Sequence, residues 1–286
     1  MPAYRAYSMA IRSELPLLLP ERSESVPTPD VEARRGTLRQ SDDESGLYVE
    51  REGVEARIPD ESTVVVDPGR RGAPMVSKVV LKRCLPALLF ERGATMLHAG
   101  AVDVDGHGVA FAGTQDAGKS SLVAAMCEHG SGFLTDDILA VSTDGDRQRA
   151  LPSFPRISLT PETRNALGLE GRQVASMDGT PFEPWFDVEE WFDPNPVTVD
   201  VIYLLEERGG VESPAIRRID GRAAMERLAG HSVRSGGLDL AEPLGRQFRQ
   251  CAELCQSVPV KVLERPDGFE TMPDVVGRVE ADLRAV

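Results

Sequence analysis

The alternation of apolar and polar residues divides the chain into two parts. Residues 1 to about 75 carry short alternating runs, such as YRAYSMAIRS and TVVVDP, separated by polar and proline-rich stretches. A period of two is typical of half-buried strands, so this part is predicted to be a small, loop-rich β unit. In residues 76–92, VSKVVLKRCLPALLFER, apolar positions return at helical spacing. We predict a helix there that docks on the rest of the chain and that Pro86 bends or breaks.

Beyond this helix, predicted strands and helices alternate. MLHAGAVDVDGHGVAFAG predicts two strands around a tight DGHG turn, and KSSLVAAMCEHG predicts a helix that ends at Gly130. In ISLTPETRNALGL, Thr160 precedes Pro161, which is a favourable start for a helix. The alternation predicts an α/β fold. We place a β-rich region with its docking helix at residues 1–93 and the main domain at residues 94–286.

The stretch GTQDAGKS, residues 113–120, fits the pattern G-x-x-x-x-G-K-[ST] and lies between a predicted strand and a predicted helix. In this motif, backbone N–H groups and the helix N-terminus cradle phosphates, the lysine reaches the outer phosphates and the hydroxyl binds Mg²⁺. We therefore predict ATP binding by the loop residues Gly113, Thr114, Gln115, Asp116, Ala117, Gly118, Lys119, Ser120 and Ser121. The negative charge of Asp116 is expected to weaken nucleotide binding.

Two adjacent acids, Asp136 and Asp137, follow one helix and one strand after Lys119. They are expected at the end of a strand beside the loop. Two carboxylates about 4 Å apart repel by about 4 kcal/mol at an effective dielectric of about 20, and a metal ion would remove that conflict. We predict that Asp137 and Ser120 hold Mg²⁺ and that Asp136 takes the proton from an attacking hydroxyl. A solvated pair in a turn is the alternative.

The spacing of these acids separates classes of nucleotide-hydrolysing proteins. A Ras-like GTPase would carry an NKxD element, and the chain contains no such string. In motor and transporter ATPases the acidic strand lies much further along the chain. Here the two acids come 17 and 18 residues after Lys119, which favours a compact, kinase-like arrangement.

The stretch from Leu97 to Asp137, LHAGAVDVDGHGVAFAGTQDAGKSSLVAAMCEHGSGFLTDD, resembles the catalytic domain of HPr kinase/phosphorylase and its relatives. The resemblance implies a fold akin to phosphoenolpyruvate carboxykinase. His98 falls on the family's histidine, and Lys119 with Ser120 on its loop. By this resemblance the first aspartate exchanges the proton with help from His98, and the second contributes to the Mg²⁺ site. The catalytic residues implied are Asp136, His98 and Lys119.

Two departures from the family pattern limit what the resemblance carries over. Asp116 stands where the family loop usually has glycine, and LPSFPRISLTPE replaces the downstream E-[IVM]-RG-[LIVMF]-G signature. HPr and the reverse phosphorolysis are therefore not carried over. We predict an ATP- and Mg²⁺-dependent kinase that phosphorylates a hydroxyl, most plausibly serine of a protein or peptide. The alternatives are a small-molecule kinase on the same scaffold and an ATP-binding regulatory module without catalysis.

Charge and composition restrict the classes of molecule that the protein is expected to bind. The formal net charge of −14 argues against binding to nucleic acid or to an anionic membrane surface. Four lysines stand beside 28 arginines, which fits either adaptation to high salt or a genome that favours arginine codons. The four cysteines form no metal-ligand pattern, and no leader or membrane segment is recognisable. A cytoplasmic protein with reduced cysteines is expected, and a homo-oligomer remains open.

Other candidate residues are assigned from local context alone. Residues 181–194, PFEPWFDVEEWFDP, bring Trp185 and Trp191 together between acids. We interpret the segment as a lid or insertion packing its own aromatics, or else as a docking surface for a partner. Arg156 is expected in a surface salt bridge, with contact to substrate as the alternative. His107 and His129 are expected at the surface.

Overall fold

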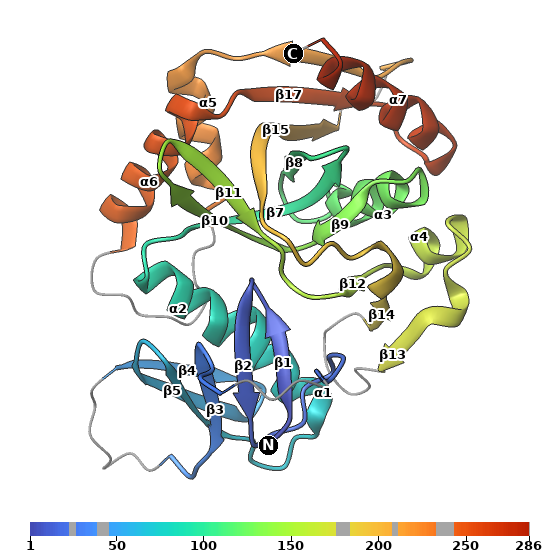
Figure 1. The fold of residues 1–286 in the computed structure, drawn as a ribbon. Helices are drawn as coiled ribbons and strands as arrows, with labels where there is room; N and C mark the ends of the chain where they lie inside the picture. The colour runs from blue at the N-terminus through green and yellow to red at the C-terminus, as the bar shows by residue number, and fades with distance from the viewer. Residues whose placement is uncertain (23–26, 39–45, 176–183, 208–210, 233–242, 286) are drawn as a thin grey trace.

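The computed structural model describes residues 1–22, 27–38, 46–175, 184–207, 211–232 and 243–285. These residues form a mixed α/β fold with separate sheets. In Figure 1 the N-terminal sheet lies at one end of the molecule and a larger sheet, flanked by helices, at the other. The boundary between residues 93 and 94 stays a prediction.

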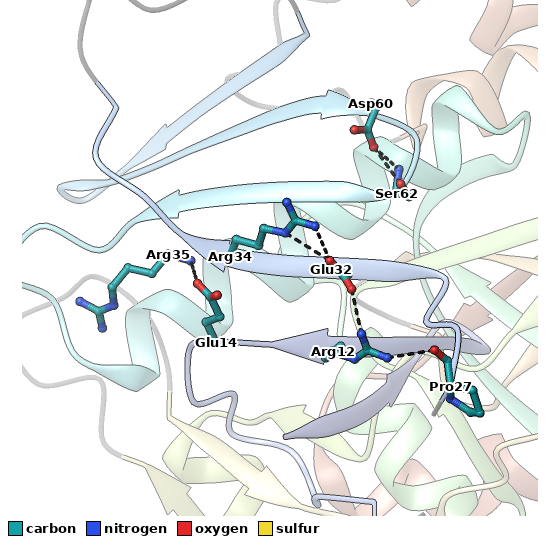
Figure 2. A network of polar contacts seen from close by, with 8 residues as sticks. All are labelled: Arg12, Glu14, Pro27, Glu32, Arg34, Arg35, Asp60 and Ser62. Atoms are coloured by element: carbon teal, nitrogen blue, oxygen red, sulfur yellow. Dashed lines mark hydrogen bonds and ion pairs between the residues drawn. The ribbon is translucent and has the colours of Figure 1, made fainter. Parts of the chain in front are cut away.

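The N-terminal sheet has the strand order β1-β2-β3-β6-β5-β4. Its strands are β1 (Ala3–Ala6), β2 (Met9–Ser13), β3 (Val31–Arg35), β4 (Leu47–Arg51), β5 (Val54–Asp60) and β6 (Thr63–Asp67). Alternate residues along most of these strands are buried, as the sequence pattern predicts. Other positions carry polar networks: Figure 2 shows Glu32 accepting hydrogen bonds from Arg12 and Arg34.

One continuous helical segment lies between this sheet and the rest of the chain (Figure 1). It consists of α1 (Ala73–Val79), a π-helical stretch η1 (Val80–Cys84) and α2 (Leu85–Glu91). Pro86 lacks an N–H, and its ring crowds the carbonyl group four residues earlier. The helix widens into a π-turn just before the proline instead of ending there. Of the two predicted effects of Pro86, the break is therefore wrong, and the bend stays a prediction.

The larger sheet has the order β11-β10-β7-β8-β15-β17-β16, and β9 pairs with β7. Its strands are β7 (Thr95–Val104), β8 (His107–Ala112), β9 (Gly132–Thr135), β10 (Ile138–Asp144), β11 (Arg147–Leu151), β15 (Val197–Glu207), β16 (Ala215–Arg218) and β17 (Val260–Arg265). The strands β8, β15 and β17 run parallel, so their carboxyl ends meet at one edge. β11 also pairs with the start of β15, which curls the sheet.

Helices cover both faces of this sheet. α3 (Lys119–Glu128) and α7 (Met272–Leu283) pack on one face, where Phe111 and Tyr203 point. α5 (Gly221–Gly230) and α6 (Pro243–Ser257) pack on the other, against Ile202 and Leu204. α3 approaches β7 so closely that a Cβ on Gly100 would lie 2.6 Å from the Val123 side chain. A larger residue at position 100 would push the helix off the sheet.

A third, small sheet has the order β12-β14-β13. It consists of β12 (Arg156–Ser158), β13 (Gln173–Ala175) and β14 (Trp185–Asp187). Beside it lie the helix α4 (Pro161–Ala166) and the 3₁₀ turns η2 (Glu170–Arg172) and η3 (Glu189–Trp191), while the turn η4 (Phe269–Thr271) precedes α7. Thr160 caps α4 as expected, with its hydroxyl accepting from the Thr163 N–H.

The tertiary structure corrects two interpretations in this region. Trp185 is fully buried against Phe154, so it offers no docking surface; residues 181–183 of its segment lie outside the described part. Trp191 is half-buried beside the Arg172 guanidinium. Arg156 is also buried rather than at the surface, and it bridges Asp187, at 2.7 Å, and the Leu18 carbonyl.

Two further expectations concern cysteines and membrane segments. All four cysteines are free, and three of them are buried. Among the described helices, none has both the length and the apolar character needed to cross a bilayer.

Candidate functional site

The glycine loop, residues 113–118, connects the end of β8 to the start of α3. Asp116 and Gly118 both adopt left-handed backbone angles, with φ of 64° and 79°. Aspartate tolerates this region better than most residues, and glycine adopts it freely. The two angles turn the chain sharply, so that α3 begins at Lys119 and its N-terminal N–H groups face the loop.

Arg265, at the end of β17, contacts the backbone of this loop. Its Nη2 donates to the Ala117 carbonyl oxygen at 2.8 Å. A Cβ on Gly118 would lie only 2.4 Å from the same Nη2, so position 118 requires glycine for space as well as for backbone angle. Sequence reasoning missed Arg265. The arginine reaches the loop because the parallel strands β8 and β17 end at the same edge.

Lys119 points back over the glycine loop. Its Nζ donates to the carbonyl oxygens of Gly113, at 3.1 Å, and Thr114, at 2.8 Å. The residue is 6% exposed, and burial lowers the pKa of its ammonium group, although the negative charges of Asp137, Asp116 and Asp136 oppose this shift. Two of the three N–H donors of the lysine ammonium group are thus engaged by carbonyl groups of the loop.

The two aspartates lie between β9 and β10, beside the loop as predicted. Both strands pair with β7, and the register of β10 places Ile138 opposite His98. This register brings His98 Nε2 to 3.3 Å from an oxygen of Asp137. The histidine thus contacts the second aspartate, whereas the family resemblance assigned it to the first.

Asp136 is the buried member of the pair, at 3% exposed. Its Oδ2 accepts a hydrogen bond of 2.8 Å from the Ser158 N–H, at the end of β12. Burial raises the pKa of this carboxyl group, and the neighbouring charge of Asp137 raises it further; Lys82 opposes both effects. A carboxylate with a raised pKa is suited to accept a proton.

The Asp137 side chain is more exposed than that of Asp136, and two side chains contact its oxygens. Lys82 Nζ donates to its Oδ2 at 2.9 Å, and His98 contacts the other oxygen. Burial alone would raise the pKa of Asp137, but Lys82 and His98 together hold it well below its usual range. Asp137 therefore remains a carboxylate across the physiological pH range.

Lys82, on η1, balances the aspartate pair in the structure. Its Nζ lies 2.9 Å from Asp137 and 3.8 Å from Asp136, while the Trp185 ring centroid lies 5.8 Å away. Burial alone would lower the pKa of Lys82, but the two carboxylates raise it. The repulsion that we expected a metal ion to remove is thus already offset by this ammonium group. The sequence signal for it was the group of basic residues Lys78, Lys82 and Arg83 within a mostly apolar helical segment.

These residues line a single cavity of about 790 Å³. Of the residues predicted to form the site, it collects His98, Gln115, Asp116, Gly118, Lys119, Ser120, Ser121, Asp136 and Asp137. Gly113, Thr114 and Ala117 are not in its lining; they shape the loop behind it. The residues that sequence reasoning missed in the lining include Arg51, Lys78, Lys82, Arg83 and Arg265.

Comparison with known proteins does not assign the chain to a family. No protein-family model and no curated protein matches the chain. Among solved structures, the chain is similar to the Hpr(Ser) kinase/phosphatase from Coxiella burnetii, at 12% sequence identity, with 66% of this chain and 97% of that chain covered and a TM-score of 0.36. An identity and a TM-score this low assign no activity to the chain.

Proposed function

We propose that the protein is an ATP- and Mg²⁺-dependent kinase that transfers the γ-phosphoryl group to a hydroxyl, serine of a protein or peptide. One observation carries the proposal: His98, Lys119, Ser120 and both aspartates line the same cavity although they come from different elements. A phosphate-binding loop, a carboxylate with raised pKa and a carboxylate with lowered pKa are the groups that phosphoryl transfer requires.

The nucleotide would occupy the glycine loop. The N–H groups at the start of α3 and the Lys119 ammonium supply positive charge for its phosphates. Arg265 fixes the loop backbone through Ala117. When bound, ATP with Mg²⁺ supplies the phosphoryl group and a divalent charge that offsets the charge developing on the phosphate oxygens. Transfer forms the bond between serine Oγ and phosphorus and breaks the bond between phosphorus and the leaving ADP oxygen.

Asp136 would accept the proton of the serine hydroxyl. Its raised pKa makes it the better base of the pair, and the Ser158 N–H holds its other oxygen in place. His98 touches Asp137 and not Asp136, so we assign His98 to positioning Asp137. The rate should therefore rise with pH through the pKa of Asp136, and the acidic limb of kcat/KM should lie above the ordinary aspartate value of about 4.

The donor set fits a magnesium ion. Mg²⁺ prefers oxygen ligands and is usually held by one or two protein groups together with substrate phosphates. The Ser120 hydroxyl and the Asp137 carboxylate are oxygen donors on the same cavity, and Asp137 stays ionised. Lys82 and His98 occupy the two Asp137 oxygens, so a metal ion would compete with these contacts.

Transfer of labelled phosphate from ATP to serine-bearing peptides and proteins tests the proposal. We expect Asp136→Asn to lower kcat by about 10²- to 10⁴-fold, as removal of a general base does. Lys119→Met should weaken ATP binding, because the charge facing the phosphates is lost. Asp146→Asn, in the exposed turn between β10 and β11, is the matched control and should transfer at the wild-type rate.

The possible results separate the alternatives. Undiminished transfer by Asp136→Asn would remove the assigned base. Phosphorylation of free serine or another metabolite, with no peptide acceptor, would select a small-molecule kinase. Tight ATP binding by calorimetry without transfer to any acceptor would select a regulatory module.

A further inference from the structure

The segment that follows β17 passes along one side of the cavity, next to the glycine loop. Arg265 begins this segment, and its Nη2 donates to the Ala117 carbonyl oxygen of the loop at 2.8 Å. Four positions later Phe269 lines the same cavity, and so does Met272 at the start of α7. Met272 and Ala117 belong to one hydrophobic cluster, and Phe269 packs against it. The glycine loop and a small apolar surface therefore share one side of the cavity.

Phe269 is the one phenylalanine, tyrosine or tryptophan among the described residues that line this cavity. Its side chain is half-buried. Other aromatic rings near the small sheet are covered: Arg164 lies over the Phe186 ring, and Arg172 lies over the Trp191 ring. Within the described part of the chain, no aromatic ring and no cationic group is stacked on Phe269. The lining thus contains one aromatic ring that is not stacked on any described side chain.

The backbone on both sides of Phe269 forms a tight turn. The chain reverses at Gly268, where φ is 94°, and the Thr271 hydroxyl donates to the Gly268 carbonyl oxygen at 2.8 Å. The turn η4 then leads directly into α7. A side chain on a turn that is hydrogen-bonded in this way is held in place before a ligand binds, which lowers the entropy that binding costs.

A second apolar pair in the lining, Met75 and Val79, lies on the side of the aspartates. Both residues are on α1, and the same continuous helical segment carries Lys82, which contacts both aspartates. The acceptor hydroxyl has to reach Asp136 to give up its proton, so the acceptor needs this side of the cavity. The side that holds Phe269 is left for the part of the nucleotide that extends beyond its phosphates.

We propose that Phe269 and Met272 form the binding site for the base of the nucleotide, with the base stacked on the phenyl ring and the phosphates on the glycine loop. Stacking tolerates different bases, because every base has a π face. The site therefore accepts adenine and guanine alike, and the phosphate donor is a purine nucleoside triphosphate rather than ATP alone. This inference rests on the proposed binding of a nucleotide to the loop, but not on the transfer of its phosphate.

Calorimetry on the full chain with three magnesium-loaded ligands, ATP, GTP and inorganic tripolyphosphate, separates the base contact from the phosphate contacts. Phe269→Leu keeps an apolar side chain and removes the ring. We expect it to weaken binding of ATP and GTP about tenfold each, as loss of one base–aromatic stack does, and to change binding of tripolyphosphate less than about twofold. Lys119→Met should weaken all three ligands. Phe248→Leu, on an exposed ring of α6 outside the cavity lining, is the matched control and should bind as the wild type does.

A second variant guards against loss of binding through misfolding. Phe269→Trp enlarges the ring and should bind ATP at least as tightly as the wild type does, a result that an unfolded chain cannot give. Wild-type affinity of Phe269→Leu for ATP, or a loss confined to one of the two nucleotides, would overturn the stacking site.

The outcomes also separate this site from the kinase proposal. Binding of ATP that depends on Phe269, without transfer to any acceptor, would keep the base site and reject the kinase. Phosphate transfer by Phe269→Leu with an unchanged KM for ATP would keep the kinase and reject the base site. Undiminished binding of all three ligands by Lys119→Met would remove the loop as the phosphate site and reject both proposals.

Discussion

At the scale of single residues, Lys82 decides the chemistry of the aspartate pair. It is 8% exposed and its ammonium group lies against two neighbouring carboxylates. Removing one partner of a buried ion pair costs far more than removing an exposed one, because the remaining charge is left without compensation in a poorly solvated place. The same contact that stabilises the fold thus sets which aspartate is ionised.

We expect Lys82→Met to lower the free energy of unfolding at pH 7 by about 3 kcal/mol, the lower end for a broken buried pair because Asp137 is partly exposed. Without Lys82, burial and mutual repulsion act on the two carboxyl groups with less opposition, so the pKa of the pair rises in the folded variant and a proton is taken up as pH falls. Protonation removes the uncompensated charge, so the deficit of the variant should shrink between pH 7 and pH 4.5. Urea unfolding at both pH values measures it.

An exposed pair of equal length provides the comparison. Arg222 and Glu226 are also 2.9 Å apart, but on the surface of α5. Arg222→Met should leave the unfolding midpoint unchanged, since exposed pairs contribute little. Adding Asp136→Asn to Lys82→Met should restore part of the lost stability. A deficit that grows toward pH 4.5 would contradict the assigned ionisation of the pair.

At the scale of elements, the junction of β8, the glycine loop and α3 depends on the end of β17. Gly118→Ala would place a methyl group against the Arg265 guanidinium and would force alanine into a left-handed conformation, which alone costs about 1–2 kcal/mol. We expect Gly118→Ala to cost more than this, and Arg265→Ala to recover the excess in the double variant. A double-mutant cycle by urea unfolding measures the coupling.

Gly130, just after α3, is the matched control for this cycle. It also has a positive φ, of 102°, but a Cβ there would meet nothing within 4 Å. Gly130→Ala should therefore show the backbone cost without any coupling to Arg265→Ala. Equal coupling energies at positions 118 and 130 would mean that Arg265 does not support the loop.

At the scale of the whole molecule, charge is distributed unevenly. The net charge is −14, while the described lining of one cavity carries six basic and five acidic side chains. Repulsion between surface carboxylates opposes the compact state, and salt screens it. The same salt would screen the attraction of the proposed anionic nucleotide to the cavity, so stability and ligand affinity should respond to salt in opposite directions.

We expect the thermal midpoint of unfolding to rise with NaCl and the affinity for ATP to fall, because the screening length drops from about 10 Å at 0.1 M salt to about 3 Å at 1 M. Calorimetry measures both quantities. Sucrose should stabilise the protein without weakening ATP binding, since it does not screen charge. A midpoint still rising steeply above 1 M NaCl would indicate adaptation to high salt, and a plateau would favour codon usage as the origin of the arginines.

Several local features followed from the sequence alone. The turn at residues 105–106, the strand, loop and helix across residues 107–128, the position of the two aspartates after β9 and the Thr160 cap all agree with the sequence pattern. Each depends on residues only a few positions apart, through side-chain periodicity, turn geometry or capping. The residues that make such interactions are close together in the sequence, so these features can be predicted without knowledge of the tertiary structure.

The contacts between these local features and distant residues were decided only by the tertiary structure. Lys82 meets Asp137 across 55 positions, and Arg265 meets the glycine loop across 148. The contact of His98 with Asp137 follows from the register of β7 and β10, and a slip of one residue would turn the side chain to the other face. Trp185 is buried because the N-terminal region packs over it. Sheet register and the packing of distant segments set these pairs, and neither can be derived from short-range sequence patterns.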